Sequence, residues 1–463
     1  MIHTTADQGR AVTPAASLEQ FGYHQELKRS LSLFDLVVYG LVYINLVAPL
    51  TTFGIVFNAS HGMVPLVYVV GAMAMALTAS SYVTMSRVFP VAGSVYTYAG
   101  RGIGETAGFF AGWVILLDYV LLQAVGYVVT AVAIQSIVPD VPRGVWIVLL
   151  IAFNTTINLL GIEATARVNR LVLVLMFTTI GLFIAIALAG LSSGVAGARL
   201  SSTPFFTPSE FTPTLIFGAL AIAMSAFLGF DAISTLAEEA RGGSAIIGRA
   251  TLLALGVASV VIVVESYLAS LFALSRTSFP PGQPTDGAIY DIAVLIGGPA
   301  FRVFMVIGKV LVSGIGGVLL AQVATARILY GMARDGNLPR FLAHVHASRR
   351  VPDKAIIAVA AMNLVGGLAF ANQMALVISL VNFGALTGFL LLHLSVIVHF
   401  LWRQQSRNWL AHLVVPLLGV AINGYVLLNL AVPAKVGGIT WLATGVLVLM
   451  GLRLTGRRIV MPV

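Results

Sequence analysis

Five ionisable residues interrupt or end segments of the sequence that are otherwise apolar: Asp118, Asp231, Glu238, Glu265 and Lys309. A charge inside a bilayer costs a few kcal/mol or more, so each such residue requires a partner or a function. A carboxylate at that depth can bind an ammonium group or take up a proton. These residue types therefore indicate the binding of a small cation or the movement of protons.

Asp231 and Tyr119 are the first candidates for contact with an ammonium group. Tyrosine offers a hydroxyl and a ring face, and the ring is worth roughly 0.5–2 kcal/mol to a desolvated cation. The structural alternatives are an acid that is hydrogen-bonded to neighbouring helix ends and a tyrosine that only packs. Phe227 and Phe230 flank Gly229 and either shape the pocket or serve as simple packing.

Glu238 and Glu239 end the sixth apolar segment, and Arg241 and Arg249 follow in the next loop. We expect the two acids to face these arginines, as a solvated charge pair or as an inner gate. Direct substrate contact is the third possibility, and Glu238 is preferred for it.

Glu265 lies well inside the seventh apolar segment and has no matching charge on its own helix face. It can pair with Lys309 or act as a proton carrier. A neutral carboxyl hydrogen-bonded to Ser266 or to another helix is the structural alternative.

The composition places these residues in a membrane protein. Of the 463 residues, 59% are hydrophobic and only 9% are charged, whereas a soluble domain carries about 25% charged residues. There is no cysteine, which excludes a disulfide framework. The net charge of +9 is spread over short loops, so soluble enzymes, nucleic-acid binders and secreted disulfide scaffolds are disfavoured. No motif predicts a cofactor or a metal site.

Apolar segments near or above the ~20 residues that cross a bilayer recur along the chain and predict twelve membrane helices. Their ranges are 33–57, 64–88, 106–137, 144–160, 168–191, 213–238, 249–274, 300–333, 355–371, 374–401, 409–431 and 439–455. An even number places both termini on one side. With the N-terminus in the cytoplasm, 20 of the 26 Lys and Arg residues fall inside and five outside, so the positive-inside rule predicts cytoplasmic termini.

Two of these segments contain residues that break helices. Residues 43–54 include Asn45, Pro49 and Gly54, and residues 225–231 end in Gly229-Phe-Asp231. The breaks fall in the first helix of two successive five-helix blocks, 31–191 and 213–401, which enter the membrane from opposite sides. Paired interruptions in inverted repeats mark the central binding site of a transporter. Candidate substrate contacts at the first break are Asn45, Ala48, Pro49 and Thr51. Two plain kinks are the simpler interpretation.

Several motifs resemble those of the amino acid–polyamine–organocation (APC) transporter superfamily over roughly residues 30–455. They are Phe89-Pro-Val-Ala-Gly-Ser-Val-Tyr-Thr-Tyr98, Gly108-Phe-Phe-Ala-Gly-Trp113, Gly161-Ile-Glu-Ala-Thr-Ala-Arg-Val-Asn169, Gly229-Phe-Asp231 with Glu238-Glu239, and Ala326-Arg-Ile-Leu-Tyr-Gly-Met-Ala-Arg-Asp-Gly-Asn-Leu-Pro339. Residues 117–119, 227–239 and 381–385 are most similar to the putrescine importer branch. The resemblance implies a LeuT-like core of five plus five helices with broken helices 1 and 6, two further C-terminal helices, alternating access and uptake that is usually proton-linked.

Two departures from the superfamily pattern bear on function. The first break carries Asn45-Leu-Val-Ala-Pro-Leu50 instead of a glycine-rich stretch, and these bulky residues crowd a substrate carboxylate away from the helix amides. That favours an amine. In the fifth helix, Met176 stands where many amino acid carriers of the superfamily have a lysine, and we hypothesise that Lys309 supplies the missing cation.

The sequence thus predicts a proton-coupled importer of putrescine or a related amine and not an enzyme. Asp231, Glu265 and Lys309 are the candidate coupling residues. No further acid is expected near the first break, where a diamine requires a second anchor, so a carrier of a neutral amino acid or another small metabolite stays open. A transport-inactive sensor or a passive channel would also be compatible with this pattern.

Its expected partners are the small-molecule substrate, protons and the lipid bilayer, and no nucleic acid. We expect a cytoplasmic N-terminal tail over residues 1–30 and a transport core over residues 31–401. Helices 11 and 12 and the cytoplasmic C-terminus then occupy residues 402–463. The expected location is a bacterial cytoplasmic (inner) membrane.

Overall fold

The computed structural model describes residue 19 and residues 24–135, 140–242, 244–280, 285, 287–369 and 374–454. This part of the chain is helical, and its one β-type pairing is an isolated bridge between Leu31 and Ala240. The main helices are α1 (Leu33–Ile44), α4 (Val64–Val88), α6 (Glu105–Gln135), α7 (Arg143–Leu160), α8 (Ile162–Ser192), α9 (Pro213–Ala223), α10 (Ser244–Leu271), α12 (Ala288–Leu311), α13 (Val318–Arg334), α14 (Asp353–Ala369), α15 (Met374–Val396), α16 (Val415–Leu428) and α17 (Val432–Leu454).

Eleven helical segments of the described chain are long and apolar enough to cross a membrane. The predicted all-α membrane class is therefore confirmed. The predicted segment that is not among these eleven is the ninth, 355–371, which corresponds to α14; this helix has 17 residues and ends beside residues 370–373, outside the described ranges. The expected ends at residues 137, 371 and 455 also lie outside them, as do most of the N-terminal tail and the last nine residues.

The first membrane helix is broken, as predicted. Helix α1 ends at Asn45, which adopts a left-handed conformation with φ 60°, and the chain resumes as α2 (Ala48–Thr51) and α3 (Phe53–Ala59). Pro49 explains the position of the break: it has no amide hydrogen for the carbonyl four residues earlier, that of Asn45. This carbonyl instead accepts a hydrogen bond of 2.8 Å from the amide of Ala48.

The sixth membrane helix is broken at Gly229, which also confirms the prediction. Helix α9 passes into a 3₁₀ turn, η3 (Met224–Phe227), and the chain continues after Gly229 as a second 3₁₀ segment, η4 (Phe230–Leu236). Gly229 has φ +118°, and a Cβ atom there would lie 2.9 Å from the backbone nitrogen of Ile44. The two breaks are thus in direct contact, and only glycine permits both the backbone conformation and the close approach.

The eighth membrane segment differs most from its predicted form, a continuous helix over 300–333. Helix α12 begins earlier, at Ala288, and bends at Gly298, just before Pro299. A π-helical turn, η5 (Val312–Gly317), then joins α12 to α13. A short helix, α5 (Val95–Gly102), also lies between α4 and α6, where no helix was predicted.

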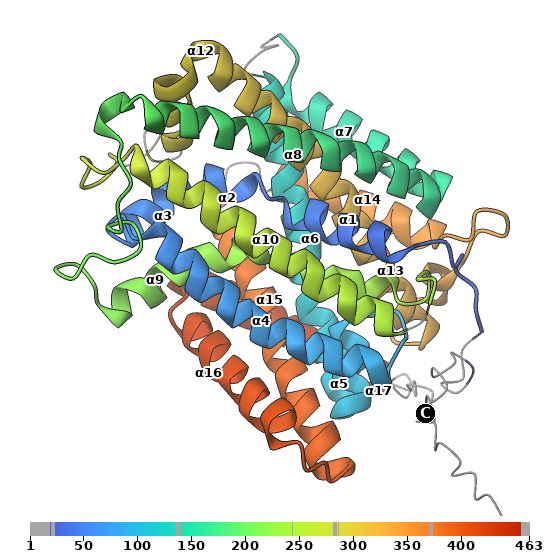
Figure 1. Ribbon diagram of the computed structural model, residues 1–463. Coiled ribbons are helices and arrows are strands. Elements are labelled where there is room, and N and C mark those ends of the chain that lie inside the picture. Colours follow the sequence, from blue (N-terminus) through green and yellow to red (C-terminus); the bar gives the residue numbers. More distant parts are fainter. Residues whose placement is uncertain are drawn as a thin grey trace, which may run out of the picture.

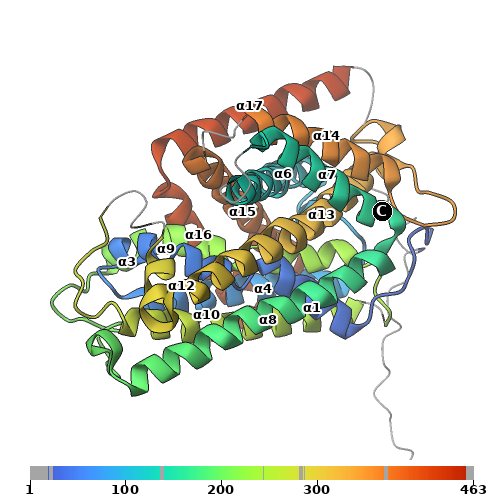
Figure 2. The same cartoon turned by 90° about the horizontal axis from the view of Figure 1, so that it is seen from above.

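The helices form one bundle with the broken segments inside it. Helices α1, α10 and α4 run side by side across the front of Figure 1, and α10 contacts both of the others. Helices α16 and α17 lie at the edge of the bundle against α15, as seen along the other direction in Figure 2. The two C-terminal helices therefore cover the core from outside, and the broken sixth helix packs against α1, α4, α10 and α13.

Candidate functional site

Asp231 and Tyr119 form a hydrogen-bonded pair at the break of the sixth helix. The Tyr119 hydroxyl donates to one carboxylate oxygen of Asp231, and the Gly229 amide donates to the other at 3.1 Å. Both side chains are 1% exposed. The two candidates from the sequence, Asp231 and Tyr119, are therefore in direct contact. The hydrogen bond from the Gly229 amide is also the kind of helix-end contact that the structural alternative for Asp231 requires. Both of these donors are neutral groups.

Aromatic rings surround this pair. The rings of Tyr43 and Tyr119 meet edge to face with centroids 6.0 Å apart. Phe230 lies 6.0 Å from Tyr82 and 6.1 Å from Phe389. Phenol and phenyl rings in such an arrangement offer π faces to a cation and exclude water from it. Phe230, which precedes Asp231, packs among these rings, and its role in shaping a pocket stays a prediction.

The first break is held by a side-chain contact that the sequence did not reveal. Asn45 donates from Nδ2 to Oγ of Ser313 at 2.7 Å, which ties the end of α1 to the π-helical turn η5. Ser313 was not among the candidates from sequence, because small residues in a membrane helix are typical of close helix packing. Its neighbour Gly314 does serve that purpose, since its backbone closely approaches Thr130 of α6.

Ala48 and Pro49 lie in α2, immediately after the break. Thr51 belongs to the same short helix, but its side chain is outside the described set. These positions remain predicted substrate contacts through the opened backbone between α1 and α2.

Asp118 is a further buried acid that the predicted site did not include. It is 1% exposed, its Oδ1 has no hydrogen-bond partner among the described residues, and it interacts electrostatically with Asp231. Its position directly before Tyr119 was the available signal. Two acids, one on the third and one on the sixth membrane helix, are therefore close enough to interact.

Glu265 lies close to the first break, where no further acid was expected. Its side chain is fully buried on α10, which contacts α2, and it interacts electrostatically with Tyr68 of α4. Neither carboxylate oxygen has a hydrogen-bond partner in the described part of the chain. The hydrogen bonds considered from sequence, to Ser266 or to Lys309, are therefore not formed in this conformation. The sequence could not show this approach, because it depends on which face of α10 meets the break.

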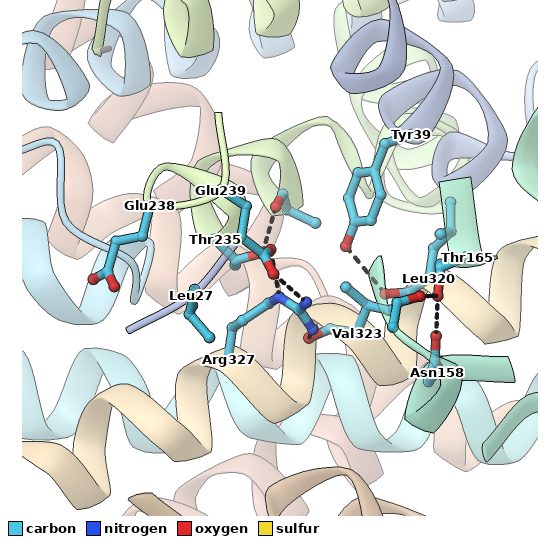
Figure 3. Close-up of polar contacts among 12 residues, drawn as sticks. Leu27, Tyr39, Asn158, Thr165, Thr235, Glu238, Glu239, Leu320, Val323 and Arg327 are labelled. Atoms are coloured by element: carbon cyan, nitrogen blue, oxygen red, sulfur yellow. Dashed lines mark hydrogen bonds and ion pairs between the residues drawn. The ribbon is translucent and has the colours of Figure 1, made fainter. Parts of the chain in front are cut away.

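Glu238 and Glu239 form ion pairs, but not with the arginines that follow them in sequence. Glu239 accepts two hydrogen bonds from Arg327, of 2.9 and 2.7 Å, and both side chains are at most 1% exposed. Glu238 is bound by Arg334 at 2.9 Å and by the amide of Ala92 at 3.0 Å. Figure 3 shows the two acids pointing in different directions, with Arg327 below Glu239. The expected partners Arg241 and Arg249 were wrong, because α13 packs against this end of the sixth helix.

Most of the motifs that carry the family resemblance meet at this end of the bundle. The loop before α5 supplies the amide of Ala92, and Tyr96 donates its hydroxyl to Asp335 at 2.6 Å. Asn337 in turn donates to the Tyr96 hydroxyl at 2.8 Å. The amides of Ser30 and Leu31 donate to the carbonyl of Glu239 and bring the segment before α1 onto the same cluster. These contacts close the bundle on the side of the N-terminus, and Glu238 belongs to this closure in the present conformation.

Lys309 lies in the last turn of α12, one helical turn before Ser313, and is partly buried. The adjacent Gly308 packs against Thr179 of α8. Met176, one turn earlier on α8, is fully buried. Lys309 is therefore on the helix that faces the fifth membrane segment. Within the described ranges, no group of three His, Cys, Asp or Glu side chains is placed to hold a metal ion.

Comparison with known proteins agrees with this architecture. The amino acid permease family model matches residues 48–448. The chain belongs to the amino acid permease family, within the APC superfamily.

Its full-length relatives are transporters. The low-affinity putrescine importer PlaP of Escherichia coli is 33% identical over 92% of this chain and 93% of its own length. The branched-chain amino acid permease BcaP of Bacillus subtilis is 27% identical over 92% and 93%, and a methylthioribose transporter of the same organism is 26% identical over 94% and 95%. This family member is a multi-pass membrane transporter and not an enzyme, as predicted.

Proposed function

We propose that this permease imports a small organic cation, putrescine or a related amine, in symport with protons. The observation that carries the proposal is the buried Asp231, whose hydrogen bonds come from the neutral Tyr119 hydroxyl and Gly229 amide. Such donors hold a carboxylate in place without cancelling its charge. Glu238 and Glu239 are occupied by arginines, so at the sixth-helix break Asp231, with Asp118 beside it, has charge to offer a substrate ammonium.

Two further observations support an amine. Bulky residues, Leu46 and Val47, stand at the opened end of α1 where a substrate carboxylate requires exposed amides, and both are buried. The relative of 33% identity is itself described as a putrescine importer. Carbonyl groups freed at the breaks add partial negative charge, which suits an ammonium.

Transport proceeds by alternating access. The present conformation is closed at the end where Arg327 binds Glu239 and Arg334 binds Glu238. Opening toward this side requires that both ion pairs separate or move together with the sixth helix. By the positive-inside rule this side is the cytoplasm, and both termini lie there.

Asp231, Glu265 and Lys309 are the proposed coupling residues. Protonation of either acid removes a charge that attracts the substrate, so a proton and an ammonium group compete for the same carboxylate. In symport, the proton carried with the amine must therefore be bound by a coupling residue that does not hold an ammonium group. Lys309 supplies a cation beside the fifth membrane segment, where Met176 replaces a lysine. We expect Lys309→Met to retain putrescine binding and to lose the dependence of uptake on the pH gradient. Unchanged coupling in this variant would remove Lys309 from the mechanism.

Proteoliposomes containing the purified protein test the function directly. We expect concentrative uptake of labelled putrescine under an inward proton gradient, and collapse of that uptake when a protonophore is added. Uptake that never exceeds equilibrium would identify a passive channel, and binding without uptake a sensor. A thermal-shift screen against diamines, monoamines and amino acids then identifies the substrate class, and stabilisation by amino acids alone would favour the neutral amino acid carrier.

A further inference from the structure

We propose that Glu265 is the second anchor of an extended α,ω-diamine whose first ammonium group is held by Asp231. The inference rests on the proposed function and deepens it, because it makes the site selective for two positive charges at a fixed separation. The segment around the first break has no acid of its own, and in this proposal α10 supplies one, Glu265.

The position of Glu265 follows from the packing of α10 on α1. Ala254 of α10 faces Gly40 of α1 so closely that a Cβ atom on Gly40 would lie 2.8 Å from that of Ala254. The two helices run in the same direction (Figure 1). Three turns farther on the same buried face stands Glu265, and α10 also contacts α2. The carboxylate is thus level with the segment that follows the first break.

The neighbours of Glu265 connect it to both breaks. It interacts electrostatically with Tyr68, whose hydroxyl lies 3.4 Å from Oγ1 of Thr52, just past α2. The ring of Tyr68 also packs against Phe227, in the break of the sixth helix, with centroids 6.2 Å apart. Tyr68 therefore links the surroundings of Glu265 to the segment after the first break and to the break of the sixth helix.

The unsatisfied state of Glu265 indicates a missing partner. It is fully buried, and neither oxygen finds a hydrogen-bond donor in the described chain. A buried carboxyl without partners is costly to the fold, and it persists where a function requires it. An ammonium group supplies the three donors that such a carboxylate lacks.

The spacing of the two acids suits a diamine of about four carbons. Gly229 contacts the end of α1 at Ile44, four residues beyond Gly40, whereas Glu265 lies eleven residues beyond Ala254, the residue of α10 that faces Gly40. At about 1.5 Å per residue in these two continuous helices, Glu265 lies roughly 10 Å farther along the bundle than the Gly229 contact. An extended four-carbon diamine has about 6 Å between its nitrogens, and a charge-assisted hydrogen bond of about 2.8 Å at each end extends its reach to about 12 Å.

The test measures how well amines of different length displace labelled putrescine from the purified protein at equilibrium, a measurement that does not depend on proton coupling. In the unaltered protein, we expect diamines of four or five carbons to bind at least about tenfold more tightly than butylamine or a two-carbon diamine, since one charge-assisted contact separates them. In Glu265→Gln this advantage falls below about twofold, while butylamine binds as before. Ser266→Ala is the matched control and keeps the full advantage, because the Ser266 hydroxyl bonds the carbonyl of Val263 on its own helix.

A second variant keeps the inference testable if Glu265→Gln fails to fold. Glu265→Asp retains the carboxylate on a side chain that is one methylene shorter, so we expect the preferred diamine to become longer by about one carbon. A flat length profile in the unaltered protein, or equal losses for mono- and diamines in either variant, would overturn the role of Glu265 and leave amine transport intact. If no amine is taken up at all, the proposed function fails instead.

Discussion

Arg327 and Glu239 form a two-pronged ion pair that is shielded from water, with side chains 1% and 0% exposed. The pair joins α13 to the end of the sixth membrane segment, and Glu239 also receives the amides of Ser30 and Leu31 through its carbonyl. One residue therefore connects three segments that must separate before the bundle can open on this side.

Breaking this pair is expected to destabilise the closed conformation. Glu239→Gln or Arg327→Met leaves one buried charge without its partner, at a cost of about 3–5 kcal/mol. The thermal unfolding midpoint of purified protein should fall, and the thiol of an added Ser234→Cys change, at a buried position, should react faster with a thiol reagent. The double variant Arg327→Met/Glu239→Leu should recover part of the stability. Glu210→Gln, in the exposed pair with His61, is the control and should shift stability by less than about 1 kcal/mol.

The bond between Tyr119 and Asp231 is expected to matter more for transport than for folding. Asp231→Asn should abolish concentrative uptake of putrescine. Tyr119→Phe should weaken apparent affinity by about tenfold, because a hydrogen bond to a charged group is worth about 1.5–3 kcal/mol. In an equilibrium binding assay of the double variant, Tyr119→Phe should not lower the affinity below that of Asp231→Asn alone. Additive losses would show that the two residues act independently.

Gly229 should not tolerate a side chain. Its φ of +118° disfavours other residues, and a Cβ atom would lie 2.9 Å from the backbone of Ile44 and of Tyr43. We expect Gly229→Ala to cost about 1–3 kcal/mol and to push the two breaks apart, so that uptake is lost along with thermal stability. Gly218→Ala is the matched control, because nothing lies within 4 Å of a Cβ atom there. Normal uptake by Gly229→Ala would mean that the contact between the breaks is dispensable.

The orientation can be tested without removing any natural thiol, because the chain has no cysteine. Arg349→Cys should be labelled by an impermeant reagent only from the cytoplasmic side, and Thr203→Cys only from outside. Both residues are exposed. The reverse pattern would overturn the orientation that the positive-inside rule predicts, and with it the assignment of the Arg327–Glu239 pair to the inner side.

The sequence by itself determined the features that depend on local chemistry. Composition and apolar length predicted a helical membrane protein, and the range 64–88 is the observed α4. Asn45 with Pro49, and Gly229, marked the two breaks, because missing amide hydrogens and positive φ angles are properties of single residues. The start predicted for the fifth helix, residue 168, was wrong, because α8 begins at Ile162. The polar residues Glu163 and Arg167 lie within its first turns, so a search for apolar segments missed them.

Only the tertiary structure decided which side chains meet. Tyr119 and Asp231 are 112 positions apart, Glu239 is bound by Arg327 rather than by the nearby Arg241, and Glu265 reaches the first break from another helix. Hydropathy fixes which residues enter the membrane, but it is nearly silent about how each helix is rotated, because lipid and protein interiors are similarly apolar. Rotation is set by close contacts such as Gly40 with Ala254, and these contacts determine which acids surround the breaks.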